Sequence, residues 1–235
     1  MDKRDWIWLS LFSISMAFLE SAVVVYLREI YYPNGFGFPL VPIGQKIAIT
    51  ELFRELATMI MLLGIGILVG KNKIERFAYF LYSFAIWDIF YYVFLKCLLN
   101  WPDSLLTWDV LFLIPVTWVG PVIAPIITSI TMIALAIILV KKSNQNQSFK
   151  MSFTDIFLLV LGSLITILAF IQDYVSFLMS NCELSEWSLF SNEAIFERSA
   201  NYIPTDFNWA LFVFAELILI TPILMIYKRK IKLVE

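Results

Sequence analysis

Six long apolar stretches constrain this chain more than any other feature, because each is close to the roughly 20 residues that an α-helix needs to cross a bilayer core. They cover residues 6–27, 47–69, 77–95, 120–140, 153–179 and 207–227. Hydrophobic residues make up 60% of the 235 residues and charged residues only 15%, too few charges to coat a soluble domain of this size. The sequence therefore predicts an all-α fold: a polytopic integral membrane helix bundle with six transmembrane helices, forming one domain over residues 1–235.

The distribution of lysine and arginine predicts the direction in which the bundle crosses the membrane. Most of the 17 basic residues lie beside one set of helix ends, at positions 3–4, 71–76, 141–150 and 228–232. Because cytoplasmic loops are enriched in lysine and arginine, these ends are expected to lie inside the cell. We expect a multi-pass protein of the cell membrane with both termini in the cytoplasm.

One further apolar segment, residues 105–120 (LLTWDVLFLIPVTWVG), permits an alternative with seven spans. A seventh span would move the later basic clusters to the outside, so the basic pattern favours six. Prolines at 102, 115 and 121 would also break a continuous helix, and tryptophans at 101, 108 and 118 suit a membrane interface. We expect an outer interfacial or re-entrant segment at about 101–119.

Five carboxylates fall at a similar depth on five different predicted helices. With a rise of ~1.5 Å per residue, they lie ~9–14 Å from the outer helix ends. They are Glu20, Glu55, Asp88, Asp173 and Glu216. Ionisable groups inside a membrane are costly and are expected to face the protein interior, so we predict that these groups converge on one polar cavity in the outer half. The fourth stretch carries no charge inside its span and is expected to serve as packing support.

Two helical faces extend this predicted layer. Glu51, Arg54 and Glu55 stand at i, i+3 and i+4 in the second stretch, and Asp88 and Tyr92 stand at i and i+4 in the third. The candidate ligand-binding residues are therefore Glu20, Glu51, Arg54, Glu55, Asp88, Tyr92, Asp173 and Glu216. The alternative, which stays open here, is that these groups form only internal ion pairs and hydrogen bonds.

Several classes of chemistry are not supported by the sequence. The chain has no histidine, which excludes haem ligation by histidine, HExxH zinc sites and Ser-His-Asp hydrolysis, and no phosphate-binding loop or CxxC motif is present. We therefore expect no cofactor, no metal site and no nucleic-acid partner. The two cysteines, Cys97 and Cys182, both map to the outer side, where they either pair or remain two separate thiols.

The excess of acids in the predicted layer favours binding or transport of a small cationic or amphipathic molecule. Two alternatives remain: a structural or assembly subunit of a membrane complex, and a metal-independent membrane enzyme that uses a protonated carboxyl as general acid on a lipid-like substrate. The expected partners are the lipid bilayer, a small-molecule, lipid or cation ligand, and either another membrane protein or a second copy of the chain.

Overall fold

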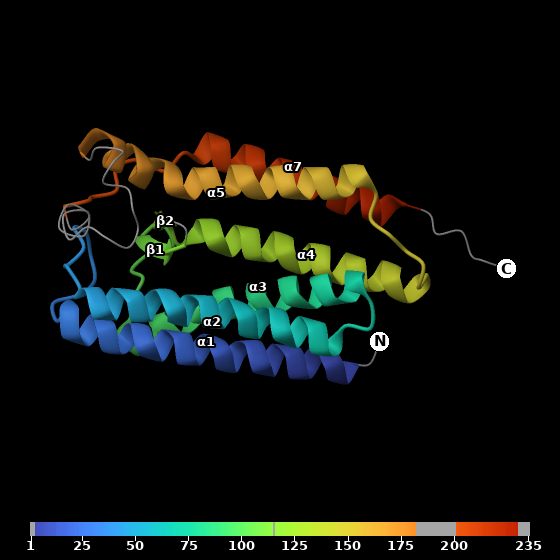
Figure 1. The fold of residues 1–235 in the computed structure, drawn as a ribbon, viewed down its shortest axis with the longest axis horizontal. Helices are drawn as coiled ribbons and strands as arrows, with labels where there is room; N and C mark the ends of the chain where they lie inside the picture. The colour runs from blue at the N-terminus through green and yellow to red at the C-terminus, as the bar shows by residue number, and fades with distance from the viewer. Residues whose placement is uncertain (1–2, 115, 182–200, 230–235) are drawn as a thin grey trace.

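The computed structural model describes residues 3–114, 116–181 and 201–229. Within these residues six helices are long and apolar enough to cross a membrane, which confirms the predicted helix bundle (Figure 1). The helices are α1 (Lys3–Tyr31), α2 (Gln45–Val69), α3 (Lys73–Leu99), α4 (Ile123–Gln145), α5 (Phe153–Asn181) and α7 (Trp209–Lys228). Most extend a few residues beyond the predicted apolar stretches, because polar residues continue each helix past its apolar run.

Helix α3 organises one half of the bundle. It packs against α1, α2 and α4, whereas α5 and α7 pair with each other and α4 also contacts α7. Gly66 allows the close approach of α2 to α3, since a Cβ atom there would lie 2.8 Å from the backbone oxygen of Arg76 and the backbone nitrogen of Phe80. Helix α4 therefore connects the group formed by α1, α2 and α3 to the pair formed by α5 and α7 (Figure 1).

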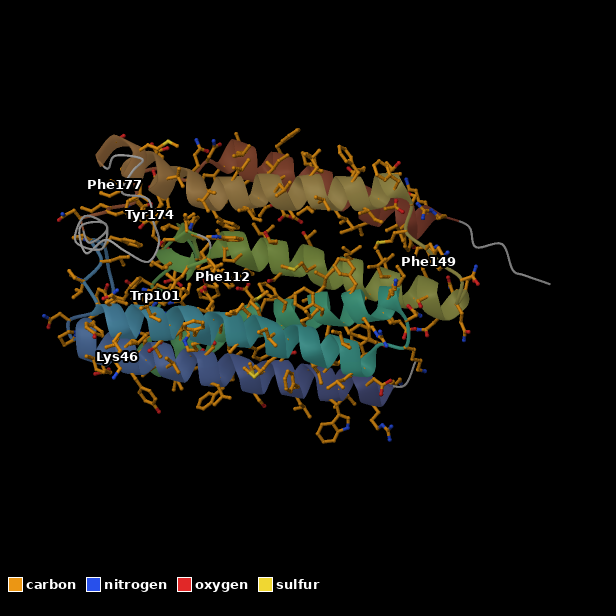
Figure 2. The ribbon with its side chains drawn as sticks, in the orientation of Figure 1. Lys46, Trp101, Phe112, Phe149, Tyr174 and Phe177 are labelled. Atoms are coloured by element: carbon orange, nitrogen blue, oxygen red, sulfur yellow. The ribbon has the colours of Figure 1, made fainter. Side chains whose placement is uncertain are left out.

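The segment predicted to be interfacial or re-entrant forms a small antiparallel hairpin instead of a further helix. Strand β1 (Trp108–Phe112) pairs with β2 (Trp118–Pro121), and Asp109 stands opposite Gly120 in the register. The hairpin lies between α3 and α4 in the chain and sits at one end of the bundle, which we call the hairpin end (Figure 1). Figure 2 shows Trp101 and Phe112 at this end, and Tyr174 and Phe177 of α5 also lie there.

The opposite end of the bundle holds the first residue of α1 and the last residue of α7 (Figure 1). A buried apolar cluster that includes Leu9, Leu139 and Ile226 joins α1, α4 and α7 there. Large apolar side chains such as Leu68 and Phe153 are more than 80% exposed, as expected of surfaces that contact lipid.

Candidate functional site

A cavity of about 390 Å³ lies at the hairpin end, between α1, α2, α3, strand β1 and the loop that follows α1. Six of the eight candidate residues predicted from the sequence line it. They are Glu20, Glu51, Arg54, Glu55, Asp88 and Tyr92. The structure therefore brings together groups that are up to 72 positions apart in the chain, from three different helices.

Arg54 links the acids of α1 and α2. Its guanidinium pairs with Glu20 across the helix interface, and its Nη2 lies 2.7 Å from Oε2 of Glu51 on its own helix. The hydroxyl of Thr58 donates a second hydrogen bond to Glu20, at 3.1 Å. Glu20 and Glu51 are each only 8% exposed, so Arg54 gives both buried carboxyl groups a positively charged partner inside the protein.

A second ion pair, which the sequence reasoning missed, joins α1 to the hairpin. Nη2 of Arg28 lies 3.3 Å from Oδ1 of Asp109. The guanidinium carbon of Arg28 is 4.2 Å from the ring centre of Phe36 and 3.8 Å from that of Trp101, so the cation is held between two aromatic rings. Two signals pointed to this pair: Arg28 follows Glu20 by eight residues on the same helical face, and Asp109 is the sole charged residue of the apolar segment 105–120.

The hairpin end also has a distinct electrostatic environment. Burial raises the pKa of Asp109 to about 6, although the neighbouring Arg28 opposes this shift. Tyr32, in the loop after α1, accepts a hydrogen bond from the backbone N–H of Val41 at 2.8 Å, which folds this loop over the cavity. Burial raises the pKa of Tyr32 above its ordinary value.

Glu55 and Asp88 differ from the other acids of the cavity because neither forms an ion pair with any described residue. Glu55 accepts the backbone N–H of Leu113, which lies 3.1 Å from each of its carboxylate oxygens. Asp88 accepts a hydrogen bond from the hydroxyl of Ser129 on α4, at 2.8 Å. In the described part of the chain the cavity thus carries five carboxylates but two arginines. The carboxylates are those of Glu20, Glu51, Glu55, Asp88 and Asp109, and the arginines are Arg28 and Arg54.

The two remaining candidates, Asp173 and Glu216, do not line this cavity, which corrects the expectation of a single site for all five acids. The hydroxyls of Thr128 and Thr131 each donate to Glu216 at 2.7 Å. Asp173 accepts hydrogen bonds at 2.5 Å from the hydroxyl of Tyr202 and at 2.9 Å from that of Thr205.

The position of α4 explains why Glu216 is separated from the cavity. Ser129 of α4 bonds to Asp88 on α3, whereas its neighbours Thr128 and Thr131 bond to Glu216 on α7. The fourth helix is therefore more than packing support, since its hydroxyls satisfy carboxylates on two different helices.

The cysteines and the acidic side chains also bear on a possible disulfide and a possible metal site. Cys97 is a free, exposed thiol near the end of α3, and Cys182 lies outside the described residues. Peptide mapping without reduction would decide between a disulfide and two separate thiols. Among the described residues there is no group of three acidic or cysteine side chains placed to hold a metal ion.

Comparison of the chain with family models, curated proteins and solved structures finds no match.

Proposed function

We propose that this membrane protein binds a small amphipathic cation in the cavity at the hairpin end. The observation that carries the proposal is the excess of acids there. Arg28 and Arg54 pair with other carboxylates, while Glu55 and Asp88 form no ion pair with a described residue and accept hydrogen bonds instead. A ligand cation beside these two groups would supply the missing positive charge in a place where an isolated carboxylate is costly.

The walls of the cavity favour a ligand that is largely apolar apart from its charge. Leu27, Leu52 and Val110 contribute aliphatic surface, and the rings of Trp87 and Tyr91 line the same space. Aliphatic groups of a ligand would be removed from water there, and aromatic faces attract organic cations. Such a lining suits an organic ammonium or phosphonium ion better than a hydrated metal ion.

The proposal includes an orientation in the membrane. The described residues of the basic clusters lie at the end opposite the hairpin, so the cavity and the loop over it would face the outside of the cell, with the termini in the cytoplasm. A ligand would then reach the cavity from the outer side. The same cavity would serve whether the protein only binds the ligand or also transports it.

Two probes of nearly equal shape and opposite charge test the proposal. Tetraphenylphosphonium and tetraphenylborate are titrated by equilibrium dialysis into the protein in nanodiscs, with empty nanodiscs to subtract partition into lipid. We expect saturable binding of the cation, weakened about tenfold or more in Glu55→Gln and in Asp88→Asn, because each loses a buried charge partner. Glu29→Gln is the matched control, since Glu29 is exposed at the same end of α1 and does not line the cavity.

The two variants also need controls for folding. Both variants must remain monodisperse and retain their helical circular dichroism, so that a loss of binding is not a loss of fold. Equal affinity for the borate, or equal affinity of Asp88→Asn and Glu29→Gln for the phosphonium, would contradict the proposal.

A further inference from the structure

A second hollow lies at the opposite end of the bundle, far from the acidic cavity. It has a volume of about 550 Å³ and lies between α1, α3 and α4. Trp6 and Tyr82 form one part of its lining, with ring centres 4.4 Å apart in an edge-to-face arrangement. Ser10 donates to the backbone oxygen of Trp6 and bonds to the hydroxyl of Tyr82, each at 2.8 Å, so this wall is fixed by its own contacts.

Along α4 the lining changes from apolar to polar within about two helical turns. Ile137 and Val140 come first, Lys141 follows, and Asn144 and Gln145 end the groove. At ~1.5 Å per residue this series covers ~12 Å along the helix axis. A membrane phospholipid has the same order of chemistry, from acyl chain through glycerol and phosphate to the polar head group.

Basic side chains at the groove supply charge complementarity to an anion. Lys141 is exposed and lines the groove, whereas the adjacent Lys142 is buried and donates to the backbone oxygen of Arg229 at 2.6 Å. Lys3 is exposed and precedes Trp6 by three residues, which places it on the same face of α1. Lys141 therefore lines the groove from α4, and Lys3 lies one helical turn from the lining residue Trp6 on α1.

Asp5 lies between Lys3 and Trp6 on α1 and offsets one of these two charges, whereas two other acids at this end are engaged elsewhere. Asp155 is 0% exposed and pairs with Arg229 at 2.8 Å. Glu75 is also buried, and it accepts hydrogen bonds from the hydroxyl of Ser143 and the backbone N–H of Lys71.

We infer that this groove binds one anionic phospholipid. Its acyl chain lies against Ile137 and Val140, and its phosphate lies between Lys141 and Lys3. Trp6 and Tyr82 stand at the level of the lipid glycerol, where aromatic side chains are favoured. This site is separate from the acidic cavity and does not depend on the function proposed for that cavity.

Native mass spectrometry with dioleoylphosphatidylglycerol as the probe tests the inference. The lipid is titrated into the protein in a nonionic detergent, with dioleoylphosphatidylcholine in a parallel series. We expect one phosphatidylglycerol to bind more tightly than any phosphatidylcholine, and Lys3→Gln/Lys141→Gln to weaken it about 25-fold, or about fivefold for each lysine. Lys73→Gln/Lys150→Gln removes the same charge from two exposed positions that do not line the groove, and it should leave this first binding step unchanged.

A second variant separates the groove from general attraction to a basic surface. Ile137→Trp keeps every charge but fills the apolar part of the groove, and it should also weaken phosphatidylglycerol binding at least fivefold. Millimolar glycerol 3-phosphate should not displace the lipid, because it lacks the acyl chain.

Three results would overturn the inference: equal effects of the two double-lysine variants, unchanged binding in Ile137→Trp, or displacement by glycerol 3-phosphate. Thermal unfolding without added lipid confirms that each variant is folded before its binding is compared.

Discussion

Replacing Arg54 with leucine is expected to destabilise the protein more than any single change of charge on its surface. Arg54 pairs with both Glu20 and Glu51, and its own side chain is 23% exposed. Removing one partner of a buried ion pair costs about 3–5 kcal/mol, and the partial exposure here favours the lower end of that range. Arg54→Lys keeps the positive charge but not the two-sided geometry, and should cost about 1 kcal/mol, the equivalent of one lost hydrogen bond.

Reversible unfolding in mixed micelles, followed by tryptophan fluorescence, measures these differences. Lys46→Leu is the matched control, because Lys46 is an exposed base on the same helix. The triple variant Glu20→Gln/Glu51→Gln/Arg54→Leu should recover most of the lost stability, since it removes the unpaired charges together with the cation. Equal stability of Arg54→Leu and Lys46→Leu, or a triple variant no more stable than Arg54→Leu, would show that Arg54 does not compensate the two buried carboxylates.

Three further predictions concern Glu216, Asp109 and the orientation of the bundle in the membrane. Glu216→Gln should retain stability to within about 1 kcal/mol, because its carbonyl oxygen still accepts from one of the two threonine hydroxyls of α4, and it should bind tetraphenylphosphonium normally in dialysis; lost binding would return Glu216 to the cavity. The folded protein holds the proton of Asp109 more tightly than the unfolded chain does, because the pKa is raised from 3.8 to about 6, so this group favours folding as the pH falls from 6 toward 4. The free energy of unfolding, measured at pH 7 and at pH 5, should rise less on acidification in Asp109→Asn than in the unchanged protein. An identical pH dependence of the two proteins would exclude this role of Asp109. In intact cells, with the native cysteines removed, a membrane-impermeant maleimide should label Asn34→Cys, but should reach Asn146→Cys only after permeabilisation; the reverse pattern would invert the proposed orientation.

The six helices could be predicted because the length and hydropathy of a span are local properties of the sequence. The hairpin was not predicted. Pro115 argues against a continuous helix, but nothing in the segment 105–120 indicates that its two halves pair in the register that places Asp109 opposite Gly120. That segment reads equally well as a helix or as an interfacial stretch, because its apolar residues follow no clear period.

The sequence indicated how far each candidate residue lies from its helix end, but not towards which neighbouring helix its side chain points. Distance from a helix end is set by a fixed rise per residue, so Glu20, Glu55 and Asp88 could be placed at one level. The rotation of each helix and the order in which helices pack are tertiary properties. For that reason the sequence did not reveal that α4 stands between Asp88 and Glu216.

The central claim, that an organic cation binds among the acids at the hairpin end, is tested most directly by photoaffinity labelling. A quaternary ammonium carrying a benzophenone is irradiated with the protein in nanodiscs, and the labelled peptides are identified by mass spectrometry. We predict labelling within residues 87–92 of α3 and 109–113 of the hairpin, suppressed by excess tetraphenylphosphonium and reduced in Asp88→Asn. Labelling concentrated at the opposite end of the bundle, or labelling of these residues that Asp88→Asn leaves unchanged, would contradict the claim.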